Sequence, residues 1–283
     1  MRWGSYFWYM KKSPIGVFDS GYGGLTILKE LKKQLPQHDY IYLGDNARAP
    51  YGTRSFETVY QYTLEAVKWF FDQGCSLVIL ACNTASAKAL RNIQQLDLPH
   101  IAPDKRVLGV IRPSSEVLGN YTNSNHVGIM ATLGTVQSDS YIIELSKFFP
   151  KVHVHQQACP MWVPLIENGE YDKPGADYFV KGYLDELFSQ SKDIDTILLA
   201  CTHYPLLEAK IKSYLPEGVK LVSQGDIVAD SLVKYLQIHP EIDQKCSKNG
   251  KIQFYTTDNA QTFEKQASSF FGQKIEANHT DLA

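Results

Sequence analysis

Residues 77–84 (LVILACNT) and residues 196–203 (TILLACTH) are nearly copies of each other, and they indicate the fold of this chain. Each stretch contains a run of apolar residues that ends on a cysteine, Cys82 or Cys201. Runs of Val, Ile and Leu without polar alternation are typical of strands that are covered on both faces of a parallel sheet. Ligands bind just beyond the carboxyl ends of such strands, so both thiols are expected at a reaction site. Thiols from two halves of a chain can flank one substrate carbon, as inversion of a stereocentre by proton exchange requires.

Strands and helices are predicted to alternate along most of the chain. The expected elements of the first half are a strand at 15–19, a helix at 25–35, a strand at 40–44, a helix from Ser55 to Gly74 and a strand at 77–82. A similar pattern then begins again, because residues 126–132 (HVGIMAT) resemble residues 14–20 (PIGVFDS). We therefore expect an α/β fold of two pseudosymmetric open-sheet α/β domains, with the active site in the cleft between them.

The expected domain boundaries follow from this repeat. A strand at 252–256 and a helix at 261–271 have no counterpart in the second half, so they are expected to return to the first domain. The expected division is a first domain of residues 10–108 plus 222–275, a second domain of residues 109–221 and a tail of residues 276–283. Residues 1–9 (MRWGSYFWY) lack the features of a secretory signal and are expected to form a disordered leader, with Met10 as an alternative start.

Composition excludes several classes of partner. The net charge is −2 and the basic residues do not cluster, which argues against a nucleic-acid surface. The apolar runs are far shorter than the roughly 18 residues that a membrane span needs. The five cysteines are odd in number and include no CxxC pair, so free thiols in a reducing cytoplasm are expected.

The cysteines are expected to fall into two groups. Cys82 and Cys201 precede polar residues that can begin a helix, and thiols near helix N-termini have lowered pKa values. This context favours a lowered pKa, and proton exchange requires one of the two groups as a thiolate and the other as a thiol. The remaining cysteines are expected to be buried as small apolar residues: Cys75, Cys159 and Cys246.

Residues 19–24 (DSGYGG) follow a predicted strand and open a predicted helix. They do not form a dinucleotide-binding GxGxxG motif, because Thr26 stands where the third glycine is required. The glycines instead allow backbone N–H groups to approach an anion such as a carboxylate at the helix N-terminus. Asp19 is expected beside this anion site, either assisting proton transfer or serving as a simple helix cap.

Residues 44–52 (GDNARAPYG) form a predicted loop after a strand. Turn chemistry alone explains Pro50 and Gly52. Asp45 and Arg48 are expected to pair and to shape the site. Tyr51 and nearby backbone groups are expected to hold the substrate.

His203 is the acid or base nearest to Cys201 in the sequence, which favours a role in proton transfer. Glu167, judged by its own surroundings, is expected to be a solvated helix residue. A competing interpretation takes Cys82, Cys201 and His203 as the ligands of a catalytic zinc ion. The spacing of these three residues is not specific for zinc, and no lysine lies in a context typical of pyridoxal phosphate enzymes. We therefore expect neither a metal nor a cofactor.

Four segments carry a resemblance to a known family: residues 18–26 (FDSGYGGLT), 44–52, 81–87 (ACNTASA) and 201–207 (CTHYPLL). In this order and spacing they resemble the bacterial glutamate racemases, of the aspartate/glutamate racemase superfamily. The resemblance implies conversion of L-glutamate to D-glutamate without a cofactor, supplying D-glutamate for peptidoglycan. It also implies a cytoplasmic homodimer that binds no nucleic acid and no membrane.

By position in these motifs, the resemblance implies that Cys82 acts on D-glutamate and Cys201 on L-glutamate. Asp19 is expected to assist Cys82 and His203 to assist Cys201, and both are also expected to contact the substrate. The other implied substrate-binding residues are Ser20, Tyr51, Gly52, Asn83, Thr84 and Thr202. The resemblance also brings three further residues into consideration, Asp45, Pro50 and Glu167, the last because it matches an acidic position of the family.

Two alternative functions stay open. An aspartate racemase, or a one-thiol decarboxylase or isomerase of the same superfamily, would share the fold, although the presence of both cysteines disfavours the one-thiol enzymes. A non-catalytic metabolite-binding protein would also have a polar cleft, but it would need no paired thiols. Incubation with L-glutamate in heavy water separates an enzyme from a binding protein.

Overall fold

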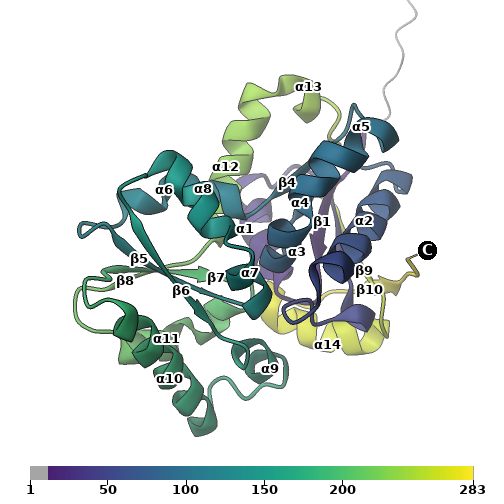
Figure 1. The fold of residues 1–283 in the computed structure, drawn as a ribbon. Coiled ribbons are helices and arrows are strands. Elements are labelled where there is room, and N and C mark those ends of the chain that lie inside the picture. Colours follow the sequence, from purple (N-terminus) through teal and green to yellow (C-terminus); the bar gives the residue numbers. More distant parts are fainter. Residues whose placement is uncertain (1–11, 283) are drawn as a thin grey trace, which may run out of the picture.

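Two parallel β-sheets with helices on their faces make up the molecule (Figure 1). The computed structural model describes residues 12–282. The predicted leader of residues 1–9 and the alternative start at Met10 lie outside the described residues. In the described part of the chain, no helix is long and apolar enough to cross a membrane.

The larger sheet has six strands in the order β10-β9-β2-β1-β3-β4. Its strands are β1 (Ile15–Asp19), β2 (Tyr40–Gly44), β3 (Leu77–Leu80), β4 (Arg106–Gly109), β9 (Ile252–Thr256) and β10 (Ala277–His279). The central strands β1, β2 and β3 are buried along their whole length. Helices cover both faces of such a sheet, which explains why these strands show no polar alternation in the sequence.

The smaller sheet repeats part of this order. Its four strands run β6-β5-β7-β8, and they are β5 (His126–Ala131), β6 (His153–Ala158), β7 (Thr196–Ala200) and β8 (Lys220–Val222). The neighbours β2-β1-β3-β4 of the larger sheet correspond in order to β6-β5-β7-β8, and every pair in both sets is parallel. β3 and β7 therefore occupy equivalent places, and the prediction of two pseudosymmetric open α/β sheets is confirmed.

Fourteen α-helices connect the strands within the described residues. Those of the first half are α1 (Gly24–Gln34), α2 (Phe56–Asp72), α3 (Asn83–Lys88), α4 (Leu90–Asn92) and α5 (Leu98–Ile101). Those that follow are α6 (Ile111–Val117), α7 (Leu133–Gln137), α8 (Ser140–Phe148), α9 (Trp162–Glu167), α10 (Pro174–Gln190), α11 (Glu208–Tyr214), α12 (Gly225–Ile238), α13 (Pro240–Asp243) and α14 (Ala260–Phe271). Ser55 caps α2 as predicted, because its hydroxyl accepts a hydrogen bond from the Thr58 backbone N–H at 3.2 Å. Gly74 follows this helix with a φ of 89°, a conformation that favours glycine.

The C-terminal segment joins the larger sheet. β9 pairs with β2, and α14 packs against α1. Within the expected tail of residues 276–283, residues 277–279 form β10 at the edge of this sheet. Its sequence is polar and short, so it carries no apolar strand pattern; the backbone groups offered by β9 decide its conformation.

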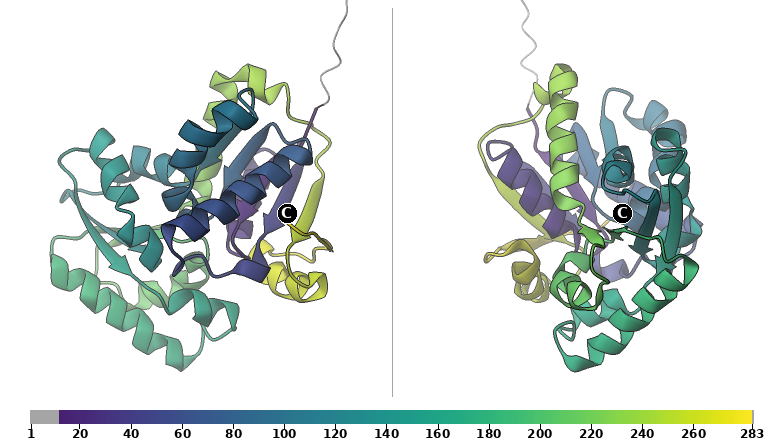
Figure 2. Two further views of the ribbon diagram at one scale, coloured as in Figure 1. Left: turned by 45° about the vertical axis from the view of Figure 1, so that its right-hand side comes forward. Right: turned by 90° about the vertical axis from the view of Figure 1, so that its left-hand side faces the viewer.

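One apolar core cluster runs through both halves. It contains Leu25 and Leu28 of α1, Trp162 of α9 and Leu199 of β7, all almost completely buried. α12 also packs along α1, and Figure 2 shows the two helices side by side. The two sheets are thus held in one packed arrangement around the carboxyl ends of β1, β3 and β7.

Candidate active site

β3 and β7 each deliver a thiol to the same cavity. Cys82 lies two residues after β3 and Cys201 directly after β7, and each is only 6% exposed. The other residues that line this cavity are Ser20, Ala49, Pro50, Tyr51, Gly52, Thr53, Asn83, Thr84, Thr132, Leu133, Cys159, Pro160, Val163, Pro164, Glu167, Thr202 and His203. Of the residues that the sequence analysis selected for the site, Asp19, Asp45 and Arg48 are absent from this lining.

Cys82 lies beside hydroxyl and carboxylate groups. Its sulfur caps α3 by accepting the Ala85 backbone N–H at 3.5 Å, and it is 3.4 Å from Ser20 Oγ. Burial, and then the nearby negative charge of Asp19, raise the pKa of Cys82 to about 12. The expectation of a lowered pKa is therefore wrong for Cys82, because desolvation of the thiolate outweighs the hydrogen bonds at the helix N-terminus.

Asp19 ends β1 and lies behind the cavity wall, only 1% exposed. Its carboxylate accepts the Gly21 backbone N–H at 2.9 Å and the Thr202 hydroxyl at 3.4 Å. Burial raises the pKa of Asp19, against the positive charge of His203, which lowers it. Asp19 thus connects the first half, which contains Cys82, to the loop that contains Cys201.

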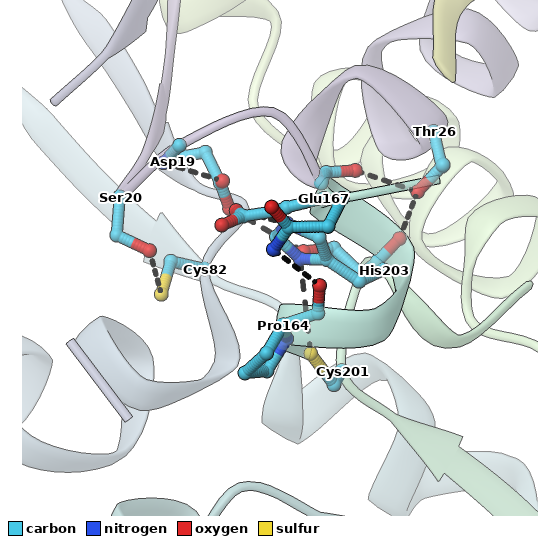
Figure 3. Close-up of polar contacts among 12 residues, drawn as sticks. Asp19, Ser20, Thr26, Cys82, Pro164, Glu167, Cys201 and His203 are labelled. Carbon is cyan, nitrogen blue, oxygen red and sulfur yellow. Dashed lines mark hydrogen bonds and ion pairs between the residues drawn. The ribbon is translucent and has the colours of Figure 1, made fainter. Parts of the chain in front are cut away.

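Cys201 lies beside an imidazole instead of a carboxylate. Its sulfur is 4.0 Å from His203 Nδ1, while His203 Nε2 is 2.9 Å from Glu167 Oε1 (Figure 3). Burial alone would lower the pKa of His203, but Cys201 and Glu167 outweigh it and raise this pKa to about 10. The raised pKa favours the imidazolium form of His203, which lies between the Cys201 sulfur and the Glu167 carboxylate.

Glu167 differs from the expectation drawn from its local sequence. It is the last residue of α9, and the expectation was a solvated position. The structure places its carboxylate on His203 at the cavity, as Figure 3 shows. Only the match to an acidic family position indicated it, because the sequence around Glu167 says nothing about His203.

The loop after β2 lies against the cavity. Asp45 is completely buried, pairs with Arg48 Nε at 2.7 Å and accepts the Tyr51 hydroxyl. The predicted Asp45–Arg48 pair is thus present, and it fixes the Tyr51 ring from behind. The Gly52 carbonyl accepts the Gly134 backbone N–H of α7 at 2.8 Å, which ties this loop to the second half.

The polar side chains after each cysteine already have protein partners. Asn83 donates to Gln224 Oε1 at 2.7 Å and accepts from the Tyr141 hydroxyl at 2.7 Å, so its amide is engaged on both sides. The Thr84 hydroxyl lies 2.9 Å from the Thr132 hydroxyl, so this contact joins the first half to the second. The side chain of Asn83 therefore helps to join the halves, and Asn83 also lines the cavity.

Thr132 is a lining residue that the sequence analysis missed. It follows β5 as Ser20 follows β1, and the repeat of residues 14–20 in residues 126–132 offered the signal. Val163 and Pro164 were also missed, because nothing in their sequence relates them to the two cysteines. Cys159 is buried as expected, although it lines the cavity as well.

The zinc interpretation receives no support from the side chains. Within residues 12–282, no three His, Cys, Asp or Glu side chains gather in a way that could hold a metal ion. His203 Nε2 is also engaged by the Glu167 carboxylate at 2.9 Å.

Comparisons with known proteins agree on one family. The model of the Asp/Glu/Hydantoin racemase family matches residues 16–232. The glutamate racemase of Bacillus cereus (strain ATCC 10987 / NRS 248) is 41% identical over 263 residues, which cover 93% of this chain and 94% of that protein. The structure of glutamate racemase isoform RacE1 from Bacillus anthracis matches with a TM-score of 0.86 at 36% identity. That of glutamate racemase from Francisella tularensis subsp. tularensis SCHU S4 in complex with D-glutamate matches with a TM-score of 0.85 at 33% identity. Each match covers 96% of this chain and 98% of the chain in the solved structure. The chain therefore belongs to the Asp/Glu/hydantoin racemase family and, within it, to the glutamate racemases.

Proposed function

We propose that this protein interconverts L- and D-glutamate by exchanging the α-proton between two thiols. The observation that carries the proposal is that Cys82 and Cys201 follow equivalent strands of the two sheets and line one cavity. Relatives of the chain are glutamate racemases, and one solved relative holds D-glutamate, which supports glutamate as the substrate.

For L-glutamate, Cys201 is the base. As a thiolate it takes the α-proton, the Cα–H bond breaks, and the electron pair remains on the carbon. Cys82 then gives its S–H proton to the opposite face, which yields D-glutamate and leaves Cys82 as a thiolate. The surroundings support these roles, because the His203 imidazolium supplies a counter-charge beside Cys201, and the raised pKa keeps Cys82 protonated.

For D-glutamate, the two thiols exchange roles. Cys82 must then lose its proton before it can act as a base, and the pKa of about 12 opposes this step. The substrate ammonium would favour a thiolate at Cys82 by its positive charge. Asp19, whose pKa is raised by burial, is proposed to assist as a nearby proton acceptor, without touching the substrate.

The substrate carboxylates are proposed to bind hydroxyl and backbone N–H groups of the lining. The proposed hydroxyl donors belong to Ser20, Thr84 and Thr202, and the proposed backbone donors to Tyr51, Gly52 and Asn83, all of which line the cavity. Pro50 is proposed to shape this loop, with Asp45 supporting it from behind. Such groups can hold carboxylates without a lysine or arginine, since N–H and O–H donors bind anions well in a water-poor cavity.

We also propose the wider role that the family resemblance implies. The protein would supply D-glutamate for peptidoglycan in the cytoplasm, as a homodimer that needs no cofactor. All five cysteines are free, which supports a reducing compartment. The domain division at residues 10–108 plus 222–275 and 109–221 likewise stays a proposal.

The test is incubation of dialysed, chelator-treated protein with L-glutamate or L-aspartate in heavy water, followed by chiral chromatography and mass spectrometry. We expect L- and D-glutamate to interconvert with deuterium at Cα, and L-aspartate to react far more slowly. Faster reaction of aspartate would make the protein an aspartate racemase. Activity that is lost with chelator and restored by zinc would support the metal interpretation, and no exchange with either substrate would indicate a binding protein.

A further inference from the structure

Lys88 is a buried cation at the far end of the helix that begins at Cys82. It is the last residue of α3 and is only 8% exposed. Its Nζ donates to the Arg54 backbone carbonyl at 2.7 Å. Within residues 12–282 no carboxylate pairs with it, and burial alone lowers its pKa. Lysines are almost never fully buried without a partner, so the position calls for a reason.

Three segments meet around this ammonium group. Arg54 closes the turn that begins at Tyr51, since its backbone N–H donates to the Tyr51 carbonyl at 3.1 Å. Gly134 of α7 packs against Lys88 and against the loop. A Cβ at this position would lie 2.8 Å from Lys88 Nζ and 2.9 Å from the Gly52 carbonyl oxygen. Lys88 thus lies where the helix of Cys82, the loop of residues 50–54 and the second half of the molecule come together.

We infer that Lys88 is a positioning residue for substrate binding, which holds the loop of residues 50–54 against α3 through the Arg54 carbonyl. This inference rests on the proposed function, because that loop lines the cavity with Pro50, Tyr51, Gly52 and Thr53. Lys88 does not line this cavity, so it acts only through the loop.

The chemistry of the contact decides what kind of effect to expect. An ammonium and a neutral amine both donate N–H groups, so the lowered pKa of Lys88 does not interrupt the hydrogen bond. Lys88 therefore sets the geometry of the loop and takes no part in proton transfer. A group that stabilises the bound substrate and the transition state equally affects KM and leaves kcat unchanged. A group that acts only in the transition state affects kcat.

The test replaces the donor and keeps the length of the side chain. In Lys88→Met we expect KM for L- and D-glutamate to rise about tenfold, the scale of one charge-assisted hydrogen bond, with kcat within about threefold of the wild type. The pH profile of kcat should be unchanged. The matched control is Lys68→Met, at an exposed lysine of α2, which should leave KM unchanged.

A second readout addresses the loop itself. Backbone hydrogen exchange of residues 51–55 should be faster in Lys88→Met than in the wild type and in Lys68→Met, while exchange in β5 and β7 stays the same. If Lys88→Met does not fold, Lys88→Gln, which is too short to reach Arg54 but keeps a polar head, should show the same rise in KM. A folded variant of Lys88 with wild-type KM would overturn the inference. Failure of the wild type to exchange the α-proton would instead overturn the proposed function.

Discussion

The two halves of the molecule repeat one fold but place different chemistry around their thiols. β1 ends on Asp19, whereas the equivalent strand β5 ends on Ala131. The position two residues after the cysteine is Thr84 in the first half and His203 in the second. Cys82 therefore lies beside a carboxylate, and Cys201 beside an imidazolium with a pKa of about 10. A duplicated sheet supplies the symmetric positions that a racemase needs, and single substitutions make the two thiols unequal.

Removal of one of the two thiols should have the largest effect on activity. Cys82→Ser or Cys201→Ser should lower the rate of racemisation by about 10² to 10⁴-fold, because serine is a far weaker acid than cysteine. An analogue that eliminates a leaving group after loss of the α-proton should still react in its L form when Cys201 remains, and in its D form when Cys82 remains. Chiral chromatography and release of the leaving group measure the two reactions.

The controls for this experiment are Cys75→Ser and Cys246→Ser, which lie away from the cavity and should racemise glutamate at nearly the normal rate. Full activity of either Cys82→Ser or Cys201→Ser would show that the repeated motifs are related only in structure.

The unequal neighbours of the thiols should separate the two directions. Asp19→Asn should slow elimination from the D form by about 10²-fold, and His203→Asn should slow elimination from the L form by a similar factor. In each variant the opposite form should change much less, because its thiol keeps its neighbour. Racemisation itself must slow equally from both enantiomers in kcat/KM, since their equilibrium constant is one. Equal effects of both variants on both forms would contradict the assignment.

In each half, a residue of the other half approaches a glycine so closely that a side chain at the glycine position would clash with it. A Cβ at Gly23 would lie 2.3 Å from both His203 Nδ1 and Thr202 Oγ1, and a Cβ at Gly134 would lie 2.8 Å from Lys88 Nζ. Gly23→Ala should therefore lower kcat by about tenfold by displacing His203, while Gly134→Ala should mainly raise KM by displacing the loop. Gly182→Ala, where an added Cβ meets nothing within 4 Å, is the control and should leave both constants unchanged.

The smallest expected effect is on stability at alkaline pH. The pKa of His203 is raised from 6.5 to about 10 in the folded state, so its contribution is fully present below pH 6.5 and is lost as the pH rises through 10. Glu167→Gln removes one cause of this shift and should reduce the loss between pH 7 and pH 10 by about 1 kcal/mol. Urea unfolding of the wild type and of Glu167→Gln at pH 7 and pH 10 measures the loss of stability in each protein. Comparing the two losses removes the contribution of the cysteines, which both proteins contain. An identical loss in both proteins would mean that Glu167 does not sustain the charge of His203.

Much of this molecule can be predicted from the order of its residues. Apolar runs such as residues 77–80 predict buried strands, and the glycines and caps between them predict turns, because both signals are local. The repeat of a strand that ends on a cysteine predicts two related sheets with Cys82 and Cys201 at one edge, and the structure confirms that both line one cavity. The pairing of Asp45 with Arg48 is also local, since the two residues lie within one turn.

Contacts between distant segments were decided only by the tertiary structure. β10 exists because β9 offers it an edge, and Glu167 reaches His203 because α9 packs beside the loop after β7. The raised pKa of Cys82 depends on how deeply the thiol is buried and on the distance to Asp19, neither of which is encoded in the local helix-start pattern. Lys88 has an ordinary place in the sequence, and its burial follows from three segments meeting around it. Local pattern thus specifies elements and candidate groups, while desolvation and partner choice arise only when remote parts of the chain pack together.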